Sequence, residues 1–389
     1  MSSTEPSRPP SAERANTAEH VAAVFGEWAD GAYADSPVHQ RICAAVAVEP
    51  SLAGPLIDWY DGHGHSLTSG DREVVQPAQL FTPVQYLLRT SATDHPLAEF
   101  YPTLGGMRPA GRPLVDAWRD FVSSHHDALV PLCGRAARQN DPQVWAQVRP
   151  GITWAATTHG DGRPVALIEL GAAAGLGLLP DFYRFDYGRV TIGDGPVTLE
   201  CHLRGNLPPG LAEELDIAER IGLELDPIAA DQPDDADWLV SAVNPEEITK
   251  LVRLGGGLAR VRDTEIDLRH GDMFDLLPVA LAEVPADHLP IVYGASVVVD
   301  ADQPDRLPRL LTAAGRDLVW IMAEATWVSY PLVTTDPAPT YDDPTVGGLV
   351  AVVIRQGTVV EVVDLARLDR YDAWLEWDPR TLTPRPELT

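Results

Sequence analysis

The sequence predicts an α/β protein in which a helical N-terminal part precedes a mostly parallel sheet. Three observations lead to this prediction. Apolar residues recur at helical spacing from Thr17 to about Gln147, short apolar runs alternate with helical segments after Pro164, and two apolar runs near the C-terminus are separated only by residues 355–358. The apolar residues therefore follow a helical spacing in the first half of the chain, and form short strand-like runs between helical segments in the second half.

Composition narrows the class of protein. With 389 residues, of which 45% are hydrophobic, the chain can bury a large core. The net charge of -28 repels phosphate backbones and anionic bilayers, so we expect neither nucleic acid nor a membrane as a partner. The first residues are polar and rich in Pro and Ser, unlike a signal peptide, and we expect a cytoplasmic protein. Its partner is expected to be a small-molecule substrate, and the sequence does not define its oligomeric state.

Changes in the spacing of apolar residues, and the positions of Gly and Pro, set the expected domain boundaries. Gly and Pro interrupt the helical half at Ser36-Pro37 and at Glu49-Pro50, and the texture changes after residues 161–164. We expect a disordered N-terminal tail at 1–16, a helical domain at 17–160, a Rossmann-like α/β domain at 161–378 and a C-terminal tail at 379–389.

The α/β domain is expected to contain five parallel strands. The apolar runs that predict them are 165–170, 221–225, 266–269, 290–299 and 318–322. Residues 245–262 and 304–314 are expected to form helices between these strands, and residues 183–192 and 197–203 an inserted hairpin.

Residues 349–354 and 359–363 are expected to pair antiparallel, because the connection between them is too short for a parallel crossover. A parallel series that ends in a reversed strand is typical of class I methyltransferases, whereas nicotinamide-binding Rossmann domains remain parallel. The sequence thus predicts a methyltransferase-type sheet that ends in an antiparallel hairpin. This analogy concerns the fold and does not by itself define a reaction.

The turn after the first strand carries the main functional signal. The stretch 165–175 resembles motif I of S-adenosylmethionine-dependent methyltransferases, in which an acid is followed by alternating glycines: Glu169, Gly171 and Gly175 match, and Ala173 replaces the middle glycine. Small residues at this bend let the backbone approach a ligand. They also permit tight packing between strand and helix without any ligand, which is the alternative explanation of the same pattern.

The same turn fits a nicotinamide cofactor less well. The dinucleotide pattern G-x-G-x-x-G would place glycines at 171, 173 and 176, where this chain has Gly171, Ala173 and Leu176. We therefore expect S-adenosylmethionine as the cofactor and keep an NAD-dependent oxidoreductase as a less favoured alternative.

Several polar residues are candidates for the rest of the site. A carboxylate at the tip of the second strand could accept hydrogen bonds from both ribose hydroxyls. Asp226 is our candidate and Glu200 the competing choice, although Asp226 lies far beyond the usual spacing of about 20 residues. Asp272 follows the third strand, where it could contact adenine or cap a helix. Tyr293 and Ser296, around the fourth strand, are the candidates for the acceptor side, and no residue stands out as a catalytic base.

A family resemblance accompanies these motifs. Residues 168–188, with Ser36-Pro37, 138–140 and 201–205, resemble an uncharacterised actinobacterial family, the domain of unknown function 2332 (DUF2332). The family pattern carries Ser where Ala173 stands, Asn where Gly177 stands and His near Gly294. The resemblance supports the fold more than the activity, because the family has no assigned reaction.

These observations predict a methyltransferase-like protein that acts on an unknown small molecule with S-adenosylmethionine. A catalytically degenerate domain of the same fold, which binds a ligand or partner without chemistry, is the first alternative. We expect no metal site, because the stretch Asp61-Gly62-His63-Gly64-His65 matches no known spacing of ligands. Cys43, Cys133 and Cys201 form no C-x-x-C pair and are expected to be reduced thiols.

Overall fold

The computed structural model describes residues 11–63, 75–138, 140–369 and 373–389. The chain divides into two compact units, which differ from the expected boundary at residue 160. Unit 1 comprises residues 1–139 and 232–252, and unit 2 comprises residues 140–231 and 253–389. Residues 145–159 belong to unit 2 because they form a helix that contacts three strands of its sheet.

The elements described in unit 1 are helical. They are α1 (Ser11–Asp30), α2 (Pro37–Val48), α3 (Gly54–His63), α4 (Ala78–Thr90), α5 (Arg112–Ser124), α6 (His126–Leu132), α8 (Pro233–Ser241) and the 3₁₀ turns η1 (Pro50–Ala53), η2 (Pro96–Phe100) and η3 (Pro102–Leu104). α1 begins at Ser11, so the expected tail at 1–16 is too long. One core holds α1–α6 together, with Phe25, Phe81 and Trp118 among its buried side chains, and α8 packs against α4.

The segment 232–252 is fixed to the helices of unit 1 by specific contacts. Glu246 accepts hydrogen bonds from the backbone N–H of Val38 at 2.9 Å and from the hydroxyl of Ser36 at 2.6 Å, and thereby caps the start of α2. The side-chain amide of Gln85 donates to the carbonyl of Val243 at 2.9 Å. These contacts explain why a segment from the middle of the α/β region belongs to the helical unit.

Unit 2 is built on a nine-stranded sheet with the order β5-β12-β11-β10-β9-β8-β1-β6-β7. Its strands are β1 (Val165–Leu170), β5 (His202–Gly205), β6 (Ile217–Glu224), β7 (Asp267–His270), β8 (Leu289–Ala295), β9 (Leu318–Glu324), β10 (Val346–Arg355), β11 (Thr358–Asp369) and β12 (Trp374–Leu382). β7, β6, β1, β8 and β9 are parallel neighbours, and β10 is antiparallel to both β9 and β11. β12 pairs antiparallel with β11 and parallel with β5.

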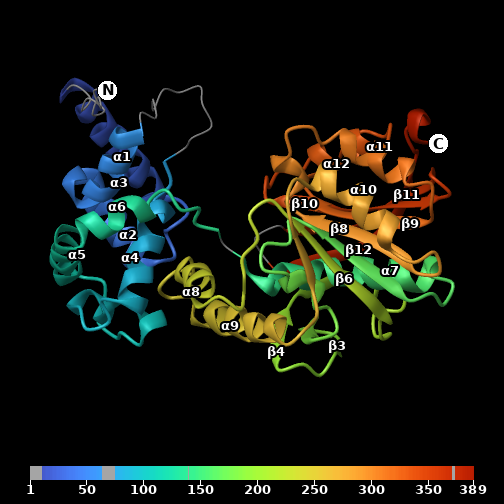
Figure 1. Ribbon diagram of the computed structural model, residues 1–389, viewed down its shortest axis with the longest axis horizontal. Helices are drawn as coiled ribbons and strands as arrows, with labels where there is room; N and C mark the ends of the chain where they lie inside the picture. Colours follow the sequence, from blue (N-terminus) through green and yellow to red (C-terminus); the bar gives the residue numbers. More distant parts are fainter. Residues whose placement is uncertain (1–10, 64–74, 139, 370–372) are drawn as a thin grey trace, which may run out of the picture. The chain divides into compact units, whose positions relative to one another are not determined.

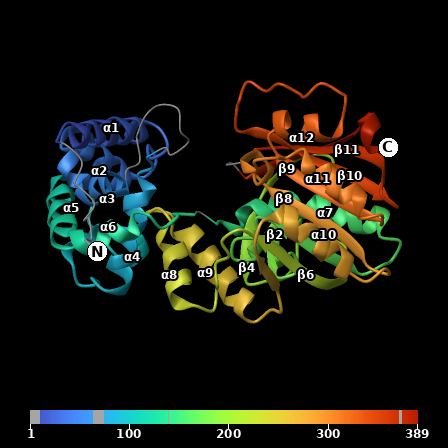
Figure 2. The ribbon, with the colours of Figure 1, turned by 45° about the horizontal axis from the view of Figure 1, so that its top comes forward.

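Helices cover both faces of this sheet (Figures 1 and 2). They are α7 (Trp145–His159), α10 (Met273–Glu283), α11 (Arg306–Ala313) and α12 (Thr326–Val333). Leu167 of β1 belongs to the core that includes α7, whereas Ile168 belongs to the core that includes the other three helices. Every residue of β1 is buried, as expected for a central parallel strand.

Most predicted strands of the sheet are confirmed, with changed ends. β1 has the predicted bounds, and the C-terminal antiparallel hairpin is present as β10 and β11. Residues 379–382 belong to β12 rather than to a tail, because they pair with β11. The expected hairpin of 183–192 with 197–203 is wrong in direction. β2 (Tyr183–Asp186) pairs antiparallel with β3 (Thr191–Ile192) and parallel with β4 (Val197–Glu200) in a separate sheet.

The remaining elements connect these layers. They are α9 (Ile248–Arg262) and the 3₁₀ turns η4 (Pro142–Val144), η5 (Leu176–Leu178), η6 (Val298–Asp300) and η7 (Pro386–Leu388). In the described part of the chain, no helix has both the length and the apolar character needed to cross a membrane.

Candidate functional site

The Gly-rich turn directly follows β1, the central parallel strand. Gly171, Ala173 and Gly175 all have left-handed backbone conformations, with φ of 68°, 48° and 79°. Glycine adopts this region freely, whereas alanine does so at a cost of about 1–2 kcal/mol. The backbone N–H of Ala173 donates to a carboxylate oxygen of Glu224 at 2.8 Å, which holds this strained residue in place.

The turn is accessible at its start and buried at its end. Gly171 is exposed and Ala173 partly exposed, whereas Gly175 is buried. A Cβ atom on Gly171 would lie 2.6 Å from Cγ2 of Val297, in the segment that follows β8. Gly171 is therefore required by its conformation and by this close approach, and it still leaves backbone accessible to a ligand.

Two buried glutamates at the ends of strands fix the surrounding loops. Glu224, the last residue of β6, accepts the N–H of Ala173 and, at 3.0 Å, that of Asp226. Glu324, the last residue of β9, accepts the N–H groups of Val297 and Val298, both at 2.8 Å. Both carboxylates thus hold backbone donors in fixed positions at the carboxyl edge of the parallel strands.

Glu169 is a third buried glutamate, and it lies within β1. Its side chain is 1% exposed, and its Oε2 has no hydrogen-bond partner in the described part of the chain. A Cβ on Gly177 would lie 2.7 Å from this oxygen and 2.4 Å from the Trp145 ring, so the acid is enclosed by η5 and α7. Burial, and to a lesser extent the negative charge of Glu224, raises the pKa of Glu169 well above its ordinary value. Burial therefore favours the protonated, uncharged form of Glu169.

The structure separates the candidate acids. β1 lies between β6 and β8, and Glu200 belongs to neither strand, because it lies in β4 of the smaller sheet. Asp226 is exposed and lies two residues beyond the end of β6. Asp272 is exposed and caps α10, because its carboxylate accepts the N–H of Phe274 at 2.7 Å. Asp226 and Asp272 both follow strands at the same edge as the Gly-rich turn.

The two candidates for the acceptor side have different environments. Tyr293 is fully buried, and its hydroxyl donates to the carbonyl of Gly177 at 3.0 Å, so it stabilises η5 rather than facing solvent. Ser296 is exposed, has a φ of 52°, and donates its N–H to the carbonyl of Ala323 at 3.0 Å. Ser296 is therefore accessible at the carboxyl edge, and Tyr293 is not.

The loops at this edge are acidic and contain no Lys or Arg. This holds for residues 171–182, 225–231, 271–272, 296–305 and 325–345. Their acids are Asp181, Asp226, Asp231, Asp272, Asp300, Asp302, Asp305, Asp336, Asp342 and Asp343. Several arginines reach these loops from elsewhere, and each has an acceptor there. Arg220 pairs with Asp181 at 2.7 Å, Arg262 donates to the carbonyl of Ala230 at 2.5 Å, and Arg309 lies 3.8 Å from Asp305. Arg380 donates to the hydroxyl of Tyr330 at 2.7 Å, and Arg385 donates to the carbonyl of Pro331. The edge therefore offers little attraction for a phosphate.

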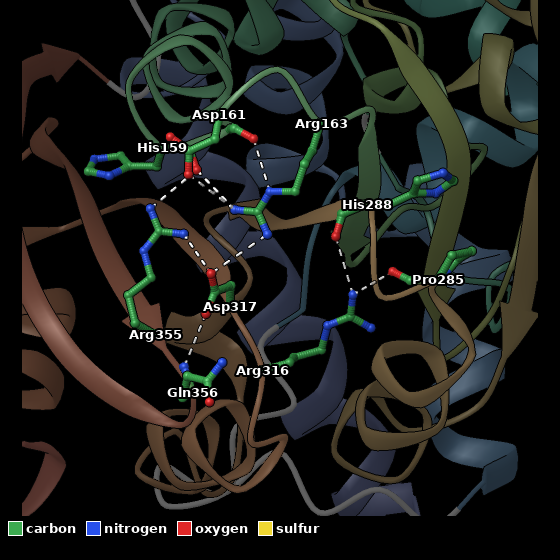
Figure 3. A network of polar contacts seen from close by, with 10 residues as sticks. His159, Asp161, Arg163, Pro285, His288, Arg316, Asp317, Arg355 and Gln356 are labelled. Carbon is green, nitrogen blue, oxygen red and sulfur yellow. Dashed lines mark hydrogen bonds and ion pairs between the residues drawn. The ribbon is translucent and has the colours of Figure 1, made fainter.

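The opposite, amino edge of the same strands carries arginines with many partners (Figure 3). Arg163 and Arg355 share the carboxylate of Asp317, at 3.6 and 2.9 Å. Arg316, just before β9, donates to four carbonyls at 2.6–3.3 Å, those of Leu281, Val284, Pro285 and His288. These contacts join the strand ends to each other, which is a structural role.

Sequence reasoning missed Glu224 and Glu324. An acid between two leucines at 223–225, and an acid after the apolar run 318–323, were the available signals. Of the Gly-His stretch, Asp61 and His63 lie in α3, whereas Gly64 and His65 lie outside the described residues. In the described ranges, no three His, Cys, Asp or Glu side chains are grouped to hold a metal ion.

Taken together, these features define an α/β protein with a mixed sheet, a left-handed Gly-rich turn after the central strand and acidic loops around that turn. The chain belongs to the family described as "Uncharacterized protein conserved in bacteria (DUF2332)", whose model matches residues 22–377. This match confirms the family resemblance seen in the sequence. No curated protein shows significant similarity to the chain.

Proposed function

We propose that this protein binds S-adenosylmethionine at the carboxyl edge of its parallel strands and acts as a methyltransferase on a small molecule. The observation that carries the proposal is the left-handed turn 171–175 on β1, where the accessible backbone of Gly171 and Ala173 meets the loops after β6 and β8. Open α/β sheets bind ligands at this edge, where the strand order reverses.

The order of the strands supports this assignment. β7, β6, β1, β8 and β9 follow the 3-2-1-4-5 order of a Rossmann-like sheet, so the switch point lies between β1 and β8. The antiparallel β10 beside β9 is the reversed strand that we associate with class I methyltransferases rather than with nicotinamide-binding domains. This support is an analogy of fold.

The charge of the edge favours a sulfonium nucleoside over a dinucleotide. A pyrophosphate would lie among aspartates, with no Lys or Arg in the loops that follow the strands. A cationic ligand would instead be attracted, because the carboxylates of Asp226 and Asp272 are exposed at this edge. The same loops therefore disfavour NAD by electrostatic repulsion.

The residues of the chain fit the parts of such a ligand. S-adenosylmethionine supplies an electrophilic methyl group when it is bound. Asp226 would accept hydrogen bonds from the ribose hydroxyls, Asp272 would contact the adenine, and the backbone at Gly171 and Ala173 would lie against the sugar and the amino acid part. The exposed Ser296 would contact the acceptor. Alignment of the two reactants is the main contribution of the protein to this reaction.

Calorimetric titration of the full chain tests the proposal. We expect micromolar binding of S-adenosylmethionine and S-adenosylhomocysteine, and no binding of NAD. The variant Asp226→Asn should weaken binding about tenfold, whereas Asp231→Asn, an exposed acid of the same loop, serves as the matched control. Binding of NAD alone would instead establish the oxidoreductase alternative, and no heat with any of the three ligands would refute a nucleoside site.

Ala173 favours a second candidate function, a degenerate domain that binds its ligand without chemistry. Alanine in a left-handed conformation carries strain that glycine would not, and no group at the edge is an evident base. The two functions differ in turnover. A methyltransferase produces S-adenosylhomocysteine when it is supplied with candidate acceptors, whereas a degenerate domain binds S-adenosylmethionine and releases it unchanged.

A further inference from the structure

A cavity lies in unit 2 at the outer strands of the sheet. It has a volume of about 340 Å³ and lies between β11, β12 and the loop 334–345. The polar residues that line it are Tyr341, Asp364, Arg367, Glu376, Asp378 and Arg380. This volume is at the lower end of the range for ligand pockets and suits a molecule with a single ring.

The strand pairing is irregular beside this cavity. The register of β11 with β12 shifts between Asp364 and Ala366, two residues that line the cavity. Such bulges redirect side chains and are frequent next to binding sites. The direction of the charged side chains at this point is therefore set by a local irregularity of the sheet rather than by regular strand pairing.

The charges in the cavity largely neutralise one another. Arg367 forms an ion pair with Glu376, and Arg380 lies 3.3 Å from Asp364 and donates to the hydroxyl of Tyr330 at 2.7 Å. Asp378 adds one further carboxylate, so the lining carries no large net charge. A phosphate would meet three acids here. The cavity instead offers several donors and acceptors in planar, paired groups.

One aromatic side chain, Tyr341, lines the cavity. The guanidinium of Arg367 lies 5.7 Å from the ring centre of Tyr341 and 5.8 Å from that of Trp374. Burial, followed by the negative charge of Asp364, raises the pKa of Tyr341, so its hydroxyl stays protonated and can donate. The Tyr341 ring thus provides apolar surface beside the charged groups of the cavity.

The loop that carries Tyr341 is held in place by hydrogen bonds. The hydroxyl of Thr326 donates to the carbonyl of Pro339 at 2.9 Å, and the hydroxyl of Thr334 donates to the carbonyl of Thr383 at 2.7 Å. The N–H of Thr383 donates to Asp336 at 2.8 Å. A wall fixed in this way needs little ordering when a ligand binds.

We propose that this cavity binds a neutral sugar ring. Adjacent sugar hydroxyls both donate and accept, which matches carboxylates and guanidinium groups that each present two atoms in one plane. The C–H groups of the ring would lie on Tyr341. Paired charges reject a phosphate, whereas a polyhydroxylated neutral molecule can use every partner without separating the ion pairs.

Saturation-transfer NMR on the full chain tests this site with three probes: the methyl glycosides of glucose, mannose and galactose. At least one probe should receive saturation at its ring C–H protons at millimolar concentration. Tyr341→Ala and Asp378→Asn should each weaken its affinity about tenfold, with thermal unfolding measured to show that both variants fold. Asp342→Asn, beside Tyr341 but outside the lining, is the matched control.

Three results would overturn the proposal. They are an absence of saturation for all three glycosides, equal saturation in wild type and Tyr341→Ala, and displacement of the glycoside by millimolar inorganic phosphate. None of them depends on S-adenosylmethionine, because the cavity contains no residue of the proposed cofactor site. A negative binding result at one site therefore does not affect the conclusion about the other site.

Discussion

The two edges of the parallel strands in unit 2 are held by different kinds of polar group. At the amino edge, arginines donate to carbonyls and shared carboxylates, and Arg316 alone has four acceptors. At the carboxyl edge, glutamates accept backbone N–H groups, and the buried acid Glu169 has an oxygen without a hydrogen-bond partner in the described residues. Left-handed residues other than glycine occur at both edges: Asp161 and Gln356 at the amino edge, and Ala173 and Ser296 at the carboxyl edge. The comparison teaches that arginines join the strand ends at the amino edge, whereas the carboxyl edge contains a buried acid of raised pKa, a feature frequent at ligand sites.

Replacing Arg316 should give the largest effect on stability. Arg316→Ala leaves four carbonyls without their donor, so we expect the free energy of unfolding to fall by about 3 kcal/mol. Affinity for S-adenosylmethionine should be unchanged. Urea denaturation measures the loss, and Arg309→Ala, whose side chain is 77% exposed, is the control. A loss no larger than that of the control would show that these contacts do not stabilise the amino edge.

A methyl group on Gly171 tests the packing of the carboxyl edge. Gly171→Ala should cost about 2 kcal/mol, because the residue has a positive φ and the new Cβ would lie 2.6 Å from Val297. Gly162→Ala, at the amino edge, isolates the conformational part of this cost: its φ is 76° and nothing lies within 4 Å of its Cβ. We expect about 1 kcal/mol there. Equal losses, measured by thermal unfolding, would contradict the close approach of Val297.

The buried acid should make stability depend on pH. Unfolded Glu169 loses its proton near pH 4.5, whereas folded Glu169 keeps it. The folded state then binds more protons, so stability falls as pH rises above 4.5, by about 1.4 kcal/mol per pH unit, until the folded pKa is reached. Glu169→Gln should remove this slope. Urea midpoints across pH measure it, with the exposed Glu200→Gln as control, and an unchanged slope in Glu169→Gln would mean that the buried acid is ionised.

Relief of backbone strain should give the smallest effect. Ala173→Gly and Gln356→Gly each replace a residue of positive φ, 48° at the carboxyl edge and 52° at the amino edge. Both variants should gain about 0.5–1 kcal/mol, because glycine avoids the left-handed penalty but loses more entropy on folding. Only Ala173→Gly should alter the calorimetric affinity for S-adenosylmethionine. A matching change in Gln356→Gly would show that the effect is not local to the turn.

The sequence predicted which residues of unit 2 form strands better than which residues their side chains contact. β1 was predicted residue for residue, because a continuous apolar run ends at a Gly-rich turn, and the short connection 355–358 defined the C-terminal hairpin. The roles of Glu224 and Glu324 could not be predicted, because their partners lie on other loops that only the folded sheet brings near. The division of the chain was missed for a similar reason. The helix predicted at 245–262 covers only part of the segment 232–252, and helical spacing does not show which core a helix joins.

The position of residues 232–252 has a consequence for synthesis. α8 packs against α4, Gln85 bonds to Val243, and Glu246 caps α2, so the first unit lacks these contacts until this segment has left the ribosome. By then β1 and β6 have already emerged, while β7, β8 and β9 have not. The nascent chain can therefore complete its first unit before β7, β8 and β9 of the sheet have emerged.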